Sequence, residues 1–184
     1  MENKEKIDVK TYNNFLDNLE KKIKEKDFFY DFEKCKEIDL KHYEKILEIE
    51  QLLNIINQYK EKEIVQNDEV QTIQVILNGN PEIVFRIGIE AVRNNVNMII
   101  CIEDFCLAQS TILVKLMSLC LKEMKLNKTI KLENMLTDSE IIENSKNIDL
   151  TICIGNSNDY NFFSKKIKNI KFNNYNINIM YILY

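Results

Sequence analysis

Apolar side chains recur at helical spacing through the first third of the chain. Over residues 12–23 they follow at intervals of three and four residues, so that they form one stripe along a helix. A second stripe of the same kind covers residues 43–56. Between them, segment 27–39 concentrates aromatic residues and is predicted to be a break that docks the helices onto the rest of the chain or onto a partner. The pattern therefore predicts a helical N-terminal extension over residues 1–65.

Beyond residue 70, short runs of β-branched residues alternate with segments of helical periodicity. Such alternation is typical of α/β proteins, in which each crossover helix returns the chain to a parallel strand. We expect a doubly wound, mostly parallel Rossmann-like sheet over residues 66–184, with helices on both faces. The predicted strands cover 70–77, 97–102, 129–132, 149–154, 170–172 at an edge, and 177–184; the predicted helices cover 81–94, 105–125, a segment that begins at 137, and 159–167.

The turn after the first predicted strand is the most distinctive local feature. The chain has three glycines and one proline, and both Gly79 and Pro81 fall in the segment Asn78-Gly79-Asn80-Pro81. Proline in the first helical turn loses no hydrogen bond, because that N–H has no partner within the helix. Gly88 lies on the inner face of the next helix and is expected to let it approach the sheet closely. A strand, a glycine turn and a helix N-terminus together form the ligand sites of many α/β folds.

Composition and charge exclude several classes of protein. The net charge of −4 argues against nucleic acid as the main partner. The N-terminal sequence MENKEKIDVK is too charged for a secretory signal, and no apolar run reaches the roughly 18 residues that span a membrane. The five cysteines form no Cys-x-x-Cys pair and lie mostly in apolar runs, which is typical of reduced, buried thiols. We therefore expect a soluble cytoplasmic protein that binds neither nucleic acid nor membranes.

A family resemblance begins at the same turn. The aldehyde dehydrogenase superfamily enters its dinucleotide-binding domain through an Asn/Pro turn, a helix and an apolar strand. Residues 80–100 resemble that pattern and read Asn-Pro-Glu-Ile-Val-Phe-Arg-Ile-Gly-Ile-Glu-Ala-Val-Arg-Asn-Asn-Val-Asn-Met-Ile-Ile. The closest likeness is to the acylating, CoA-linked branch and to acyl-CoA or glutamyl-phosphate reductases. Residues 150–156, Leu-Thr-Ile-Cys-Ile-Gly-Asn, are similar to the family strand that ends in Gly-Ser. The resemblance covers about residues 66–172 and implies a domain of the type that binds NAD(P).

Three departures from the family pattern bear on function. The family commonly ends its second strand with a lysine that contacts the adenosine ribose, whereas this chain has Ile102 followed by Glu103 and Asp104. The second glycine of the family's Gly-Ser-x-x-x-Gly turn is Tyr160 here. The family's nucleophilic cysteine lies in a glycine-rich segment downstream of the cofactor domain, and no glycine follows Gly155. The resemblance therefore implies a cofactor-type domain rather than a complete dehydrogenase.

The reactive side chains favour structural over catalytic roles. A nucleophilic cysteine needs a lowered pKa or a neighbouring base, but Cys101 and Cys153 lie within apolar strands, and only Cys106 lies near a helix start. His42 is the only histidine and is interpreted as a surface residue rather than a base or a metal ligand. The acidic residues of 61–69 are interpreted as a solvated loop rather than a cation site. Without a second histidine or a cysteine cluster there is no zinc signature.

Phosphate binding at helix N-termini is the one functional interpretation with a structural basis. Candidate termini follow strands near Pro81, Asp104 and Asp159, but each carries its own carboxylate, which stabilises the helix and repels a phosphate. Glu103 or Asp104 can instead accept a hydrogen bond from a ribose hydroxyl. Neither a Gly-x-Gly-x-x-Gly motif nor a P-loop is present. Together with the resemblance, these positions define a candidate cofactor-binding set: Asn80, Glu103, Asp104, Gly155, Asn156 and Ser157.

Two hypotheses for function follow. In the first, the chain is a truncated aldehyde-dehydrogenase-like domain without oxidoreductase activity of its own, which acts as a binding or interaction module with a second copy or a partner chain. The apolar residues of 177–184 support association, because a terminal strand of this kind must be paired or covered. In the second, the chain is an NAD(P)- or CoA-binding subunit of an oxidoreductase whose catalytic half lies on another chain.

Overall fold

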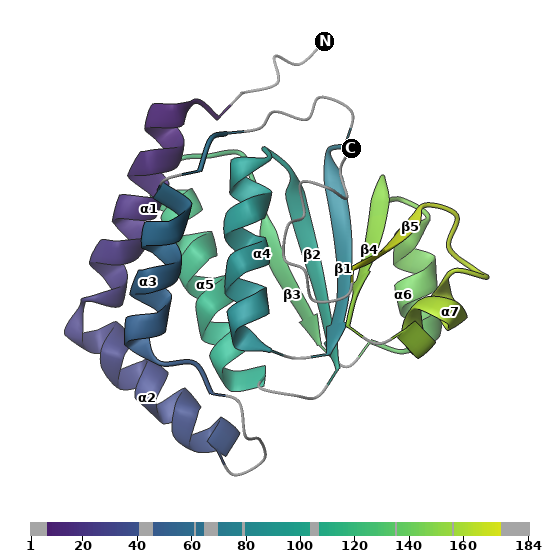
Figure 1. Ribbon diagram of the computed structural model, residues 1–184, viewed down its shortest axis with the longest axis horizontal. Coiled ribbons are helices and arrows are strands. Elements are labelled where there is room, and N and C mark those ends of the chain that lie inside the picture. Colours follow the sequence, from purple (N-terminus) through teal and green to yellow (C-terminus); the bar gives the residue numbers. More distant parts are fainter. Residues whose placement is uncertain are drawn as a thin grey trace.

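A computed structural model describes residues 7–40, 46–60, 62–64, 70–78, 80–103, 107–134, 136–155 and 157–173 (Figure 1). An N-terminal group of helices precedes an alternating series of strands and helices. The elements are α1 (Val9–Ile23), α2 (Lys26–Leu40), α3 (Ile49–Lys60), β1 (Thr72–Asn78), α4 (Pro81–Arg93), β2 (Asn97–Glu103), α5 (Leu107–Glu123), β3 (Ile130–Asn134), α6 (Asp138–Ser145), β4 (Leu150–Ile154), α7 (Ser157–Phe163) and β5 (Ile170–Asn173).

The described strands form one parallel sheet in the order β3-β2-β1-β4-β5. The crossovers through α4 and α5 place β2 and β3 on one side of β1, and the crossover through α6 carries the chain to the other side. This arrangement is the doubly wound, Rossmann-like sheet that the sequence predicts. Among the described strands β5 lies at an edge, as expected for its segment.

Side chains alternate between the two faces of the sheet, because successive residues of a strand point in opposite directions. In β1, Val75 and Leu77 belong to the large core shared with α4 and α5. Ile76 joins a smaller cluster with Ile141 of α6 and Phe163 of α7. Figure 1 shows α4 and α5 between the sheet and the outer helices α1 and α3, with α6 and α7 at the β4 and β5 end.

The N-terminal helices share the large core with the sheet. Phe15 of α1 and Ile56 of α3 are fully buried in the cluster that also holds Phe85 of α4. At the surface, Lys60 of α3 lies 2.7 Å from the carboxylate of Glu20 on α1. Hydrogen bonds from Lys24 and Lys60 lower the pKa of Glu20 to about 2. The domain boundary at residue 65 stays a prediction.

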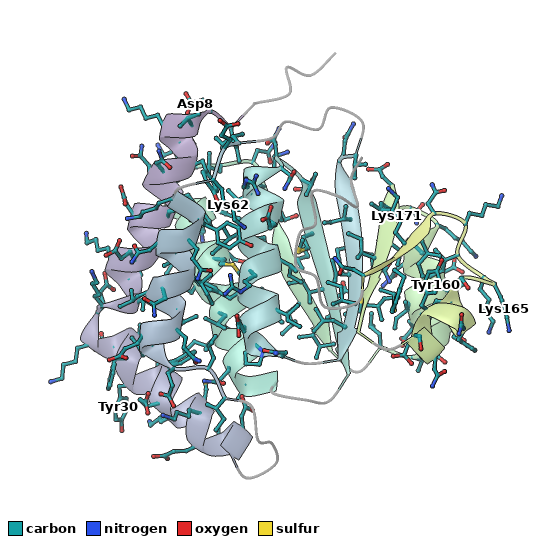
Figure 2. All side chains as sticks on the ribbon, in the orientation of Figure 1. Asp8, Tyr30, Lys62, Tyr160, Lys165 and Lys171 are labelled. Atoms are coloured by element: carbon teal, nitrogen blue, oxygen red, sulfur yellow. The ribbon has the colours of Figure 1, made fainter. Side chains whose placement is uncertain are left out.

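Segment 27–39 is a helix, and the predicted break there is wrong. The segment contains neither glycine nor proline, and α2 spans it without interruption. Phe28 and Phe32, one helical turn apart, stack with ring centroids 5.5 Å apart, and Phe32 is fully buried. Phe29 and Tyr30 are instead exposed, and Figure 2 shows Tyr30 at the outer surface of the helical layer. The aromatic residues of the segment are therefore divided between the core and the solvent.

The second N-terminal stripe is only partly helical. The helix begins at Ile49, and Ile46 and Leu47 lie in the irregular segment that precedes it. Leu47 is nevertheless buried, so its place in the predicted apolar stripe reflects burial rather than helix. Tyr43 lies outside the described residues. The spacing of apolar residues does not distinguish a helix from a buried loop directly before it, because the side chains of both pack against the same core.

Gly88 makes room for another helix rather than for the sheet. A Cβ atom built at Gly88 would lie 2.4 Å from the sulfur and terminal methyl of Met117 on α5. The next atom is Cδ1 of Ile130 in β3, at 3.7 Å. The expected close approach is therefore to α5, whose fully buried Met117 fills the space above the glycine.

Other boundaries agree with the sequence pattern to within a few residues. Pro81 begins α4, and the helix predicted to begin at residue 137 is α6, whose N-terminus Thr137 caps through a capping box with Glu140. The helix predicted over 159–167 is α7, which begins at Ser157 and ends at Phe163. The strand predicted over 177–184 lies outside the described residues.

Candidate functional site

The carboxyl ends of β1 and β4 form the topological switch point of the sheet. The connection after β1 leads to β2 on one side, and the connection after β4 leads to β5 on the other. Ligands of open α/β sheets bind in the crevice that such diverging connections create. The register pairs Leu77 with Ile154 and Asn78 with Glu103. The predicted residues on β2 and after β1 and β4 are thus brought to one edge of the sheet.

Asn80 caps α4. It has an extended backbone, with φ −120° and ψ 115°, and its side-chain oxygen accepts a hydrogen bond from the Glu82 N–H at 2.9 Å. The Glu82 carboxylate in turn lies 2.8 Å from Nε of Arg86, which also donates to Gln58 of α3 at 2.9 Å. From the sequence, the Glu82 carboxylate is expected to repel a phosphate at this helix end. In the structure it forms an ion pair with Arg86. The acceptor of Asn80 is already used within its own helix.

Replacing Asn80 with alanine is expected to lower the free energy of unfolding by about 1 kcal/mol, the usual cost of a lost N-cap. Asn57→Ala on the exposed face of α3 is the matched control and is expected to change stability by less than about 0.5 kcal/mol. Urea denaturation followed by circular dichroism measures both. Equal stabilities of the two variants would show that the Asn80 side chain does not act as a cap.

Gly155 directly follows β4 and has a positive φ of 110°, a backbone conformation that residues with a Cβ rarely adopt. Its N–H donates to the Asn173 carbonyl at 3.2 Å, which continues the ladder toward β5. Ser157 is exposed at the start of α7, and Asp104 and Asn156 lie outside the described residues. The residue in place of the family's second glycine, Tyr160, packs on Phe172 of β5 with centroids 5.2 Å apart.

Figure 2 shows Tyr160 together with Lys165 and Lys171 at the α7 and β5 end of the molecule. Tyr160 is half-buried there, and its aromatic ring joins α7 to β5.

The thiols of Cys101, Cys120 and Cys153 are buried, as the apolar runs around them predict. Burial raises the pKa of both Cys101 and Cys120 to about 12, and Cys153 is buried in β4. Burial also raises the pKa of Cys35, which has no predicted role. A thiol with a raised pKa is a poor nucleophile at neutral pH. Cys106 and His42 lie outside the described residues, and no three described His, Cys, Asp or Glu residues are grouped as metal ligands would be.

The first turn of α5, which follows β2, binds a residue that the sequence analysis missed. Asp39 of α2 is buried, and its carboxylate accepts from the N–H groups of Ala108 at 3.3 Å and Gln109 at 2.9 Å. The Gln109 side chain also bonds both backbone groups of Leu47, at 3.2 and 2.8 Å. Asp39 and Ala108 are 69 residues apart in sequence, so no local pattern could have indicated the contact.

A second missed cluster lies at the other end of α4 and holds a buried ion pair. Glu90 is fully buried, and both its oxygens lie 3.0 Å from Nη1 of Arg93. Asn94 donates to the same carboxylate at 3.2 Å. Burial and the neighbouring Glu90 raise the pKa values of Tyr12 on α1 and Tyr59 on α3. The cluster joins three helices on the side of α4 away from its N-terminus.

Lys62, in the segment after α3, also contacts this cluster. Its ammonium lies 3.5 Å from Glu90 and 3.9 Å from the centre of the Tyr59 ring. Figure 2 shows Lys62 between α3 and α4. Nε of Arg93 donates to the carbonyl of Glu63 at 2.6 Å, so the segment after α3 is tied to α4. The only sequence signal for this ion pair is the spacing of three residues between Glu90 and Arg93 on an apolar helix. That spacing does not indicate that the pair is buried.

No described helix is both long and apolar enough to cross a membrane. No protein-family model and no curated protein matches this sequence. A solved structure of gamma-glutamyl phosphate reductase from Thermotoga maritima has a similar fold, with a TM-score of 0.75 and 11% sequence identity. The similarity covers 89% of this chain and 48% of the reductase, so the chain spans about half the length of that protein. At this identity the comparison establishes the fold: this chain has a Rossmann-like α/β architecture similar to part of a glutamyl-phosphate reductase.

Proposed function

We propose that the chain is a dehydrogenase-like domain that acts as a binding or interaction module without oxidoreductase activity of its own. The observation that carries the proposal is that polar groups at the carboxyl ends of the strands, around the switch point between β1 and β4, already have partners within the fold. The acceptor of Asn80 caps its own helix, and Tyr160 packs on β5 where the family has a glycine. The first turn of α5 is already bound to Asp39. Groups that a dinucleotide would use are thus engaged within the fold.

The exposed side of α2 supports an interaction role. Tyr30 is 61% exposed and Ile38 is 54% exposed, although both are large and apolar in character. Aromatic residues of this kind are enriched in the contacts between proteins. A second copy of the chain or another protein is the proposed partner.

The alternative is an NAD(P)- or CoA-binding subunit whose catalysis is completed by another chain. The parallel sheet with a switch point between β1 and β4 favours it, because this is where dinucleotides bind in Rossmann folds. Gly155, with its positive φ, also leaves the end of β4 without a side chain. In this alternative Glu103 accepts from a ribose hydroxyl, and Gly155 and Ser157 line the cofactor.

A thermal-shift panel with NAD, NADP and coenzyme A separates the two. A ligand at about 100 times its Kd adds about 2.7 kcal/mol of stability, which raises the Tm of a chain of this size by several degrees. We expect none of the three, at about 5 mM, to raise the Tm more than AMP or adenosine does. A matched assay for NAD(P)-linked aldehyde oxidation is expected to show no turnover.

A specific rise in Tm would favour the cofactor-binding alternative. Glu103→Ala should then abolish the rise, while Glu37→Ala at an exposed position of α2 should leave it unchanged. If both variants keep the full rise, the cofactor binds somewhere other than the predicted edge.

A further inference from the structure

The two ends of the molecule differ in charge. Figure 2, in which the longest axis is horizontal, shows Tyr30 of α2 toward one end of that axis and Lys165, just after α7, at the other. Helix α2 has five acidic residues and three lysines. Residues 157–173, which include α7 and β5, have four lysines and one aspartate, although the whole chain has a net charge of −4. The α2 end is therefore acidic, and the α7 and β5 end is basic.

The outer side of α2 combines carboxylates with large apolar side chains. Its exposed residues include Asp27, Tyr30, Asp31, Glu37 and Ile38, which we call the acidic face. The opposite side of the helix is fixed in the core by the fully buried Phe32. The ammonium of Lys34 lies 4.3 Å from the centre of the Tyr30 ring, so a cation already contacts an aromatic ring of this face.

The α7 and β5 end has the complementary composition. Its exposed residues include Phe162, Lys165, Lys166, Lys168 and Lys171, which we call the basic face. The Phe162 ring packs edge-on against the buried Phe163, with centroids 5.1 Å apart, so Phe162 is supported from the core. The ammonium of Lys166 lies 3.9 Å from the centre of the Phe162 ring. This face thus also presents an aromatic ring among charges, but the charges are of the opposite sign.

The two faces match each other better than either matches itself. Contacts between proteins commonly have aromatic residues at the centre and polar residues at the rim, and complementary charge selects the partner. Two acidic faces, or two basic faces, would place like charges together, which is unfavourable. The faces lie at opposite ends of the molecule, so the acidic face of one chain cannot reach its own basic face. A contact between them requires a second copy.

We propose that copies of this chain associate head to tail, with the acidic face of one copy on the basic face of the next. This inference rests on the proposed function and deepens it, because it names the partner and both surfaces. A contact between two different faces leaves one face of each kind unpaired at the ends, so association continues beyond a dimer or closes into a ring. Both faces are small and charged, and the association is therefore reversible and sensitive to salt.

Sedimentation velocity of the full chain at increasing concentration tests this proposal. In about 0.1 M sodium chloride, the mean sedimentation coefficient of the wild type is expected to rise with concentration beyond that of a dimer. In about 1 M salt it is expected to return to that of a monomer, because the Debye length falls from about 10 Å to about 3 Å. An apolar contact without charge pairing would instead persist at high salt.

Charge reversal identifies the two faces. Lys165→Glu with Lys168→Glu reverses the basic face, and Asp31→Lys with Glu37→Lys reverses the acidic face. Each double variant alone is expected to stay monomeric, because its two faces then have the same sign. An equimolar mixture of the two is expected to associate as the wild type does, because every face again meets one of opposite sign.

Lys125→Glu with Lys131→Glu is the matched control, because it changes the net charge equally at exposed positions outside both faces. This variant is expected to associate like the wild type. Circular dichroism checks that each variant is folded, and exposed substitutions of this kind usually change stability by less than about 0.5 kcal/mol. If a reversed variant does not fold, Lys165→Gln with Lys168→Gln takes its place and is expected to weaken the association.

Three results would overturn the head-to-tail contact. The first is a wild type that stays monomeric at about 1 mM in low salt, the weak end of specific association. The second is association of the basic-face variant equal to that of the wild type, as expected if α2 pairs with α2. The third is a mixture of the two reversed variants that stays monomeric. The proposed function fails on a different measurement, because dinucleotide binding in the thermal-shift panel would contradict it whatever the sedimentation shows.

Discussion

Replacing Arg93 with alanine is expected to lower the free energy of unfolding by about 3 to 5 kcal/mol. The change removes the cation that lies 3.0 Å from both oxygens of Glu90, and it leaves a fully buried carboxylate beside Asn94, Tyr59 and the partly exposed Lys62. The Glu63 carbonyl also loses its donor. The loss exceeds what the intact pair contributes, because the desolvation of Glu90 persists after Arg93 is gone, and Lys62 is more distant and partly exposed.

Urea denaturation of wild type, Arg93→Ala and Arg86→Ala measures this effect. Arg86 lies on the same helix and pairs with Glu82, whose side chain is 38% exposed. Water screens that pair, so Arg86→Ala is expected to cost no more than about 1 kcal/mol. A loss for Arg93→Ala as small as that of the control would show that Glu90 is not a desolvated charge.

A double variant separates the charge from the packing. Glu90→Gln combined with Arg93→Met removes both charges and keeps most of the side-chain volume. Neutral replacements of a buried ion pair are often close to neutral in stability, so the double variant is expected to be more stable than Arg93→Ala. If it is equally unstable, the loss comes from the packing of Arg93 between α3 and α4.

Replacing Phe15 with alanine is expected to cost about 3 to 5 kcal/mol. Phe15 lies on α1 and is fully buried in the core that also contains residues of α4 and α5. Its removal leaves a cavity between the N-terminal helices and the helical layer over the sheet. Because that core is continuous, the loss is expected to appear in a single unfolding transition of the whole chain.

Far-ultraviolet circular dichroism and tyrosine fluorescence, followed in the same denaturation, check this prediction. Val9→Ala, at a position 62% exposed on the same helix, is the control and is expected to change stability by less than about 0.5 kcal/mol. Two separate transitions, with Phe15→Ala shifting only the first, would show that residues 1–65 unfold as a unit of their own.

The elements of the sheet could be predicted because their signals are local. Val75 and Leu77 alternate with residues on the other face, and Pro81 marks the start of the next helix. The Thr137 capping box joins residues three apart in sequence. Where the local pattern matches the buried face that the element presents to the core, the predicted and observed ends of the element differ by only a few residues.

The prediction failed where two local signals conflicted. Segment 27–39 is dense in charge and aromatic residues, which resembles a break, yet it has no helix-breaking residue. The buried Phe32 and the contact of Asp39 with α5 hold it as a helix. Gly88 was correctly placed on an inner face, but the sequence contains no information on which neighbour, sheet or helix, comes closest.

By itself the sequence determined the α/β class, the order of strands and helices beyond residue 70, and the start of α4 at Pro81. Each of these depends on contacts between residues close in the chain, or on a period that any buried face imposes. Only the tertiary structure decided that Asp39 meets α5, that Glu90 is buried against Arg93, and that Tyr160 packs on β5. The first and third join different elements, and the burial of Glu90 depends on three packed helices. Such contacts depend on how elements distant in sequence pack together, and local periodicity does not indicate them.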